Sequence, residues 1–181
     1  RTLYVAQQAG LRNINAVDME GRGLNQLGSL IIPYTEDNFP DLVDVDIALI
    51  GVCDDRNSVN NTGSNMAPNE VRSFLYKLYA GTFVPKIIDL GNIMPGKTVN
   101  DTYFALQTCV EVLVKQNIIP FIIGGTQDIT YAQFLGYKNL EQTINMVAID
   151  SVFDLGNPEE EISNTSYLGK IILHQPNYLF N

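Results

Sequence analysis

The chain is poor in histidine, cysteine and basic side chains. Its 181 residues include one histidine, two cysteines and 11 Lys or Arg against 20 Asp or Glu, which gives a formal net charge of -9. This balance, with no basic cluster to interrupt it, argues against binding to nucleic-acid backbones and to anionic membrane surfaces. We therefore expect neither a nucleic acid nor a membrane as a partner.

Long apolar runs are missing as well. None approaches the roughly 20 residues of a membrane-spanning helix, and the N-terminus lacks the charged-then-apolar pattern of a signal peptide. Cys53 and Cys109 are expected at a buried strand end and in a helix, as reduced core thiols rather than a disulfide. A cytoplasmic protein fits best. The chain starts without Met and ends on Leu-Phe-Asn with no change of pattern, which is compatible with a piece of a longer polypeptide.

What the chain does contain is a set of short apolar runs separated by helical patterns. With 45% hydrophobic residues it can bury one core. We expect strands at 47–52, 86–90, 118–123 and 143–150, and helices at 68–79, 98–116, 128–135 and 166–173. This alternation predicts an α/β fold of three layers, with a mostly parallel sheet between helices. Residues 1–40 are an irregular or helical edge segment, and 41–181 form the α/β domain.

Several details of these elements are predicted from local pattern. The helix at 68–79 should bury a face that includes Val71, Phe74 and Leu78, and the helix at 98–116 should point Phe104 inward. Either Thr98 or Asn100 can cap the second of these helices. Further inward residues of that helix are Leu106, Val110, Leu113 and Val114, and Asn117 is a left-handed stop.

The ends of two apolar runs are the candidate site. Runs 118–123 and 144–149 read as fully buried strands, and open parallel sheets carry their chemistry just past the carboxyl ends of such strands. Asp150 and Asp154 follow the second run. Two carboxylates there suit a hard divalent cation or acid/base work. Alternatively, one caps the next turn and the other is solvated.

Gly124 to Asp128 follow the first run. Gly124 and Gly125 allow close approach to a ligand, although a tight turn needs glycine in any case. Thr126, Gln127 and Asp128 open the next helix, and Asp128 is either its cap or a ligand-contacting residue. No phosphate-binding glycine pattern is present.

In order and spacing these segments resemble the N-terminal half of the ureohydrolase family, which comprises arginases, agmatinases, guanidinobutyrases and formimidoylglutamases. The resemblance covers about residues 43 to 155. It rests on the strand 47–52, Ala67-Pro68-Asn69-Glu70-Val71-Arg72, Asp89-Leu90-Gly91, the run 119–125 and the loop Asp150 to Asp154.

The resemblance implies a doubly wound parallel sheet with two manganese ions at the carboxyl ends of its strands. A metal-bridging hydroxide would hydrolyse a guanidino or formimino carbon–nitrogen bond. The implied ligand is a small amidine or amino-acid-like molecule, and the implied assembly is a homo-oligomer. The family's remaining carboxylate ligands lie in a C-terminal Ser-x-Asp-x-Asp pattern, which nothing after Asp154 matches.

This sequence departs from the family at both imidazole ligands. The family's Gly-Gly-Asp-His-Ser motif falls on Gly124 to Asp128, which places Gln127 at the first histidine position. The Asp-Ala-His-x-Asp motif falls on Asp150 to Asp154, which keeps both aspartates and places Val152 at the second histidine position. An amide is a poor manganese ligand and an isopropyl group is none.

Three hypotheses remain open. The chain is a ureohydrolase-like pseudoenzyme that binds a ligand or supports assembly, or a hydrolase of an amidine substrate with a single metal held by Asp150, Asp154 and carboxylates from outside this chain. The third is an unrelated parallel α/β enzyme. The one histidine, His174, cannot replace two ligands on different loops, and we interpret it as a surface or packing residue.

Overall fold

A computed structural model describes residues 11–12, 25–35, 37–82, 85–140, 144–157, 159–174 and 179–180. The strands are β1 (Leu11–Arg12), β2 (Ile32–Pro33), β3 (Ile47–Val52), β4 (Ile87–Ile93), β5 (Ile119–Ile123), β6 (Met146–Val147) and β7 (Leu179–Phe180). The α-helices are α2 (Ala67–Leu75), α3 (Val99–Val114), α4 (Ile129–Lys138) and α5 (Tyr167–His174), and the short 3-10 helices are η2 (Leu27–Ser29) and η3 (Ser64–Met66).

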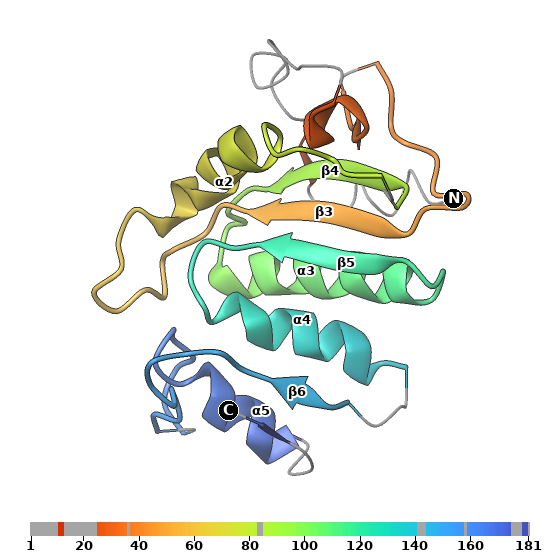
Figure 1. Cartoon of the computed structure of the whole chain (residues 1–181). Coiled ribbons are helices and arrows are strands. Elements are labelled where there is room, and N and C mark those ends of the chain that lie inside the picture. The colour runs from red at the N-terminus through yellow and green to blue at the C-terminus, as the bar shows by residue number, and fades with distance from the viewer. Residues whose placement is uncertain are drawn as a thin grey trace.

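The main sheet is built on three parallel strands in the order β4, β3, β5 (Figure 1). Ile47 of β3 lies opposite Ile87 of β4 on one side and opposite Ile119 of β5 on the other. The short strands β1 and β2 both pair with β4, β1 antiparallel and β2 parallel. Thus the described parts of the first 40 residues add to the β4 side of the sheet.

Helices cover both faces of this sheet, as the sequence predicts. On one face Ala48, Ile50 and Val52 of β3 pack in a core that includes Leu106 and Val110 of α3. On the other face Leu49 packs with the residues beside α2, in a smaller cluster of Ile31, Leu49, Tyr76 and Ile87. Successive side chains of β3 point to opposite faces of the sheet, so this strand contributes to the apolar core on each face. The three-layer arrangement is therefore confirmed.

Helix α2 ends earlier than predicted and buries a different face. It stops at Leu75, and Val71, Phe74 and Leu78 are exposed, contrary to the expected apolar face. The fully buried side chain of the helix is Arg72. The apolar spacing is misleading here because the helix contacts the sheet through an ion pair.

Helix α3 follows its prediction more closely. Thr98 is the N-cap and forms a capping box with Asp101, which decides between Thr98 and Asn100. Leu106, Val110 and Leu113 are buried, and Asn117 has the expected left-handed backbone at φ 59°. Phe104 is 68% exposed, so its inward placement is wrong.

The predicted buried strand at 143–150 is wrong. Within the described part of this run, residues 144–150, only Met146 and Val147 form a strand, and they pair with β7 in a separate two-stranded sheet. Val147 and Ile149 are 74% and 100% exposed. The run has the composition of a buried strand, but the described part of the chain supplies no strand of the main sheet beside it.

The two cysteines are buried free thiols, as expected. Burial raises the pKa of the Cys109 thiol to about 12, which keeps it protonated and unreactive. Among the helices of the described ranges, none has both the length and the apolar character to cross a bilayer.

Candidate functional site

The carboxyl ends of β3 and β5 meet at one edge of the sheet. Gly125, two residues past β5, lies so close to the end of β3 that a Cβ atom there would be 2.1 Å from the carbonyl oxygen of Asp54. The absence of a side chain at Gly125 therefore makes room for the protein's own backbone at Asp54, and not for a ligand. This contact holds the loops after the two strands against each other.

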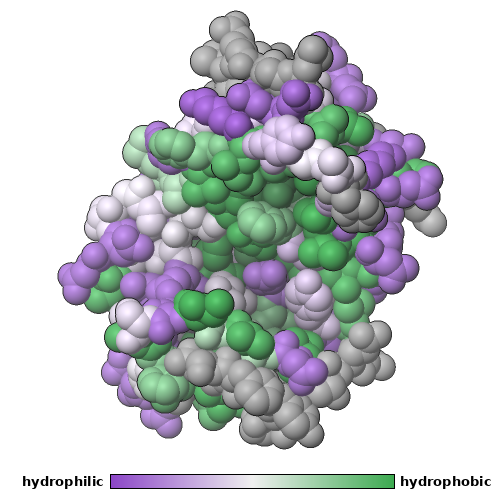
Figure 2. Space-filling view, viewed as in Figure 1, coloured by the Kyte–Doolittle hydropathy of each residue, from purple (hydrophilic) through white to green (hydrophobic). Residues whose placement is uncertain are grey.

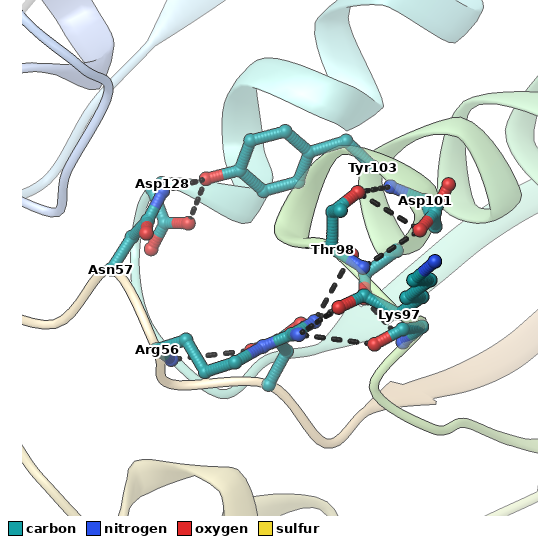
Figure 3. Close-up of polar contacts among 10 residues, drawn as sticks. Arg56, Asn57, Lys97, Thr98, Asp101, Tyr103 and Asp128 are labelled. Carbon is teal, nitrogen blue, oxygen red and sulfur yellow. Dashed lines mark hydrogen bonds and ion pairs between the residues drawn. The ribbon is translucent and has the colours of Figure 1, made fainter.

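The loop after β3 is fastened by Arg56. The guanidinium pairs with both carboxylate oxygens of Asp54, and its Nη atoms also donate to the carbonyl oxygens of Gly96, Lys97 and Thr98, just before α3 (Figure 3). Burial alone would raise the pKa of Asp54, but hydrogen bonds from Arg56 and Thr102 outweigh burial and hold the pKa below its usual value. Asp54 therefore stays ionised and acts as a structural anchor.

Asp128 lies beneath this loop, buried at 1% exposure. It occupies the N-cap position of α4, but its side chain makes no cap hydrogen bond. Its Oδ2 accepts a hydrogen bond from the Tyr103 hydroxyl, which itself accepts from the Asn57 amide, and Figure 3 shows these three side chains converging from three segments. The other carboxylate oxygen, Oδ1, is buried without a protein partner. Burial is the main reason that the pKa of Asp128 is raised.

Gln127 and Asp150 are brought together. The Gln127 amide donates a hydrogen bond to Asp150 Oδ2, so the loop after β5 and the loop after β6 meet where the sequence predicts a site. Asp150 Oδ1 also accepts from the backbone N–H of Val152 at 3.3 Å. This backbone hydrogen bond is the largest cause of the lowered pKa of Asp150, to which Gln127 contributes.

Asp154 completes the same loop. It is 8% exposed, has a left-handed backbone at φ 42°, and its Oδ2 is buried without a protein partner. Burial raises its pKa, and the neighbouring Asp150 raises it further, because a nearby carboxylate favours the protonated form of Asp154. Val152, between them in sequence, is 56% exposed.

The donor set around these residues bears on metal binding. Asp150, Asp154 and Gln127 offer two carboxylates and one amide, and Val152 offers no donor atom. Within the described ranges, no group of three or more His, Cys, Asp or Glu side chains is placed to hold a metal ion. These residues do not fit a pair of manganese ions, which require several carboxylate and imidazole ligands.

His174 is the last residue of α5. Its Nε2 lies 2.8 Å from the Tyr131 hydroxyl and its Nδ1 lies 3.2 Å from Lys138 Nζ, and the residue is exposed. Burial of the ring, with Lys138 and Lys170 nearby, lowers its pKa. The prediction of a surface histidine is confirmed.

The most buried polar cluster was not predicted. Arg72 of α2 pairs with Asp89 of β4 through two hydrogen bonds of 2.7 and 2.9 Å, and both side chains have 0% exposure. The same guanidinium donates to Asn92 and to the Gly91 carbonyl, and Tyr76 donates to Asp89 at 2.5 Å. An aspartate inside an apolar strand was the available signal, because a buried carboxylate needs a cation.

Two cavities lie near these elements. One, of about 570 Å³, lies between the start of α3, α4 and α5 and is lined by Asn57, Thr98, Val99, Asn100, Tyr131, Glu159, Glu160, Glu161, Ile162 and Lys170. The other, of about 370 Å³, lies between α4 and the β6 segment. Gly124 to Asp128 line neither cavity, so their contact with a ligand stays a prediction.

Comparison with known proteins agrees with the geometry. The family model described as the arginase family matches residues 45–176. A formimidoylglutamase of Staphylococcus haemolyticus is 28% identical over 127 residues, which is 67% of this chain and 41% of that protein. A formimidoylglutamase of Streptococcus gordonii is 29% identical over 138 residues, which is 70% of this chain and 42% of that protein.

Solved structures show the same fold. The formimidoylglutamase of Bacillus subtilis superposes with a TM-score of 0.71 at 19% identity, over 86% of this chain and 50% of that one. Trypanosoma cruzi formiminoglutamase, solved with Mn²⁺, gives a TM-score of 0.69 at 22% identity, over 81% of this chain and 52% of that one. The chain spans about half the length of these relatives, or less. With the family model matching more than two thirds of its residues, the chain belongs to the arginase family.

Proposed function

We propose that this chain is a ureohydrolase-like pseudoenzyme, which keeps the family scaffold and lacks the imidazoles of a manganese pair. The observation that carries this proposal is the contact between Gln127 and Asp150. The two loops meet as a metal site would require, yet the residue at the first histidine position uses its amide to satisfy an aspartate. An exposed isopropyl group, Val152, takes the second position.

The proposed role is binding of a small amidine or amino-acid-like ligand, or assembly into a homo-oligomer. The cavity of about 570 Å³ supports the first role, since its rim combines Glu159, Glu160 and Glu161 with Lys170. Carboxylates suit a guanidino or formimino cation, and an ammonium group suits a ligand carboxylate. The names of the relatives favour formimidoylglutamate among such ligands.

A second candidate is a hydrolase with a single metal ion. The buried, unpartnered Oδ2 of Asp154 beside the Asp150 carboxylate favours it, because an unsatisfied buried carboxylate oxygen is a position that a cation can fill. Manganese is the metal that the family suggests. Further carboxylates would come from outside the described residues.

Manganese binding and turnover together distinguish the two candidates. Protein purified from manganese-supplemented medium should contain well under one equivalent of metal and should not hydrolyse formimidoylglutamate, agmatine or arginine. Stoichiometric manganese that is lost in Asp154→Asn, together with hydrolysis of any of these substrates, would establish the hydrolase instead.

Restoring the imidazoles is the second test. The double variant Gln127→His/Val152→His should bind manganese at least about tenfold more tightly than the unmodified chain, because imidazole is a much better ligand than an amide or an alkyl group. The matched control Ser151→His/Phe153→His adds two imidazoles at positions outside the family's ligand pattern. Equal affinity of the two double variants would show that these positions do not form a metal site.

A further inference from the structure

Basic side chains gather where α4 meets α5. Lys138 is the last residue of α4, and Lys170 and His174 lie one turn apart on α5. Figure 2 shows hydrophobic side chains gathered over β3 and β5, whereas these basic side chains belong to α4 and α5, which lie lower in the same view (Figure 1). The chain carries 20 acidic against 11 basic side chains, so a meeting of two lysines with its one histidine runs against its overall charge.

His174 joins the two helices through both of its ring nitrogens. Its Nδ1 lies 3.2 Å from Lys138 Nζ, and its Nε2 lies 2.8 Å from the Tyr131 hydroxyl oxygen. A lysine ammonium group donates hydrogen bonds and accepts none, so Nδ1 accepts from Lys138 and the neutral ring carries its hydrogen on Nε2. The Tyr131 hydroxyl then accepts from Nε2–H, and its own hydrogen is available to a ligand.

These side chains form a group that we call the cationic junction: Tyr131, Lys138, Lys170 and His174. Among the residues that the structure describes, neither of its two ammonium groups forms an ion pair with a carboxylate. Tyr131 and Lys170 also line the cavity of about 570 Å³. The junction therefore opens on one side into a space that a ligand can enter.

We propose that the cationic junction binds a small oxyanion, the carboxylate or phosphate group of a ligand that enters through this cavity. The anion lies between Lys138 and His174 and accepts hydrogen bonds from Lys170 and from the Tyr131 hydroxyl. Lys138 is exposed, so its side chain can move aside without loss of packing. Hydrogen bonds from ammonium groups to carboxylate or phosphate oxygens are roughly twice as strong as those between neutral groups.

Binding of the anion is coupled to a proton. Burial of the ring, together with repulsion from Lys138 and Lys170, lowers the pKa of His174. An anion beside the ring favours the imidazolium, whose Nδ1–H donates to the anion in place of accepting from Lys138. His174 therefore takes up a proton when the anion binds, and by linkage the anion binds more tightly as the pH falls.

The remaining charged groups of the cavity wall are three exposed carboxylates. They belong to the loop before α5 and repel an anion: Glu159, Glu160 and Glu161. They confine the oxyanion site to the wall formed by α4 and α5. The chain has a net charge of -9, so non-specific attraction of anions does not explain binding there.

The alternative is that the junction only fastens α5 to α4. Phe134 of α4 already packs in an apolar cluster with Leu168 and Ile171 of α5, which joins the two helices without any charged group. The proposal shares Lys170 with the cavity of the proposed function but does not rest on that function, because neither a metal nor an amidine takes part. Its test contains neither, so the two proposals fail separately.

The test uses the one histidine as its own reporter. NMR chemical shifts of the imidazole give the ratio of protonated to neutral His174 in sodium chloride, sodium sulfate and sodium acetate at one ionic strength, which holds general screening constant. Sulfate or acetate should raise this ratio at least about tenfold relative to chloride near pH ~7. A larger effect of sulfate would identify a phosphate group as the anion, and a larger effect of acetate a carboxylate. Equal ratios in all three salts would overturn the proposal.

Two lysine variants provide a matched comparison. Lys170→Met should weaken binding of the effective anion at least about fivefold, because it removes one of the charged donors. Lys77→Met removes the same charge just after α2, which packs on the opposite face of the sheet, and should leave binding unchanged. Equal weakening by both variants, or by neither, would contradict the proposal. The titration of the unmodified chain stands even if a variant fails to fold.

The coupling to a proton has its own measurement. Anion titrations followed by backbone amide NMR should show binding at least about threefold tighter near pH ~5.5 than near pH ~8. His174→Gln should keep part of the binding through the two lysines and lose this pH dependence. An affinity that does not change with pH in the unmodified chain, or an unchanged pH dependence in His174→Gln, would remove His174 from the site and overturn the proposal.

Discussion

Two polar clusters in this molecule differ in how completely the chain satisfies them. Where α2 meets β4, Arg72 and Asp89 are fully buried, and six hydrogen bonds join them to each other, to Asn92, to Gly91 and to Tyr76. In the loop after β6, Asp150 accepts from one exposed glutamine and one backbone N–H, and one buried oxygen of Asp154 has no protein partner.

This difference distinguishes a cluster that holds the fold together from a loop that can accept a ligand. The cluster of Arg72 with Asp89 is closed: even the neighbouring Gly51 has no room for a Cβ atom, which would lie 1.9 Å from Asn92 Oδ1. Such a cluster fixes α2 on the sheet and leaves no donor or acceptor for a ligand. The loop of Asp150 and Asp154 is open on its outer side, so it is the place where a ligand or another polypeptide can still add contacts.

The largest expected effect comes from breaking the closed cluster. Arg72→Met should lower the free energy of unfolding by about 3 to 5 kcal/mol, because it leaves the Asp89 carboxylate buried without its cation. Urea denaturation measures this loss. The double variant Arg72→Met/Asp89→Leu is the control and should recover much of it. A loss below about 1 kcal/mol in the single variant would show that the cluster is hydrated.

An intermediate effect is expected at Asp128, which is as buried as Asp89 but only partly satisfied. Its pKa is raised in the folded protein above the unfolded value of about 3.9, so the folded state holds the proton more tightly. The resulting stabilisation is complete below the unfolded pKa and is lost as the pH rises through the folded pKa.

Asp128→Asn should therefore remove a pH dependence. The stability of the unmodified chain relative to this variant should fall by up to about 1.4 kcal/mol per pH unit above pH ~4, until the folded pKa is passed. Urea denaturation at a series of pH values measures it. Tyr103→Phe should extend the fall to higher pH, because it removes a hydrogen bond that lowers the pKa. Parallel pH profiles for the chain and Asp128→Asn would contradict this assignment.

The smallest effect is expected in the open loop. Gln127→Ala should change the free energy of unfolding by less than about 0.5 kcal/mol, because Gln127 is exposed and water can replace its amide at Asp150. Thermal denaturation of the chain and the variant measures the difference. A loss above about 1 kcal/mol would mean that the loop is as closed as the Arg72 cluster, and the comparison between the two would fail.

The sequence predicts those parts of the fold that depend on local pattern. The strand at 47–52 and the left-handed stop at Asn117 agree with the structure, and Thr98 is the N-cap out of the two candidates, Thr98 and Asn100, that the sequence offers. Each of these features depends mainly on its neighbours in the chain. The loops of Gln127 and Asp150 also meet, as expected, although the expected reason for it fails, because β6 belongs to a separate two-stranded sheet and not to the sheet of β5.

The failures arise where distant parts of the chain decide the outcome. Composition alone makes the run 144–149 a buried strand, but burial requires a neighbouring strand, and Ile149 is fully exposed. Arg72 shows the reverse error. Its charge predicts a surface position, but it is buried because it pairs with Asp89, which lies 17 residues away in the sequence. The hydrophobic periodicity of a helix depends on the residues of that helix alone, so it cannot reveal an ion-pair partner on a distant strand.

The hydrogen bonds of the loop after β3 bear on the order in which parts of the molecule unfold. Asn57 and Val59 hold the segment of Ile162 and Asn164 through three hydrogen bonds, each joining residues 105 positions apart. Closing so large a loop costs entropy that a few hydrogen bonds barely offset, whereas β3, α3 and β5 are joined by shorter connections. We therefore expect the segment from β6 to α5 to detach as one cooperative unit, while the remaining sheet stays folded.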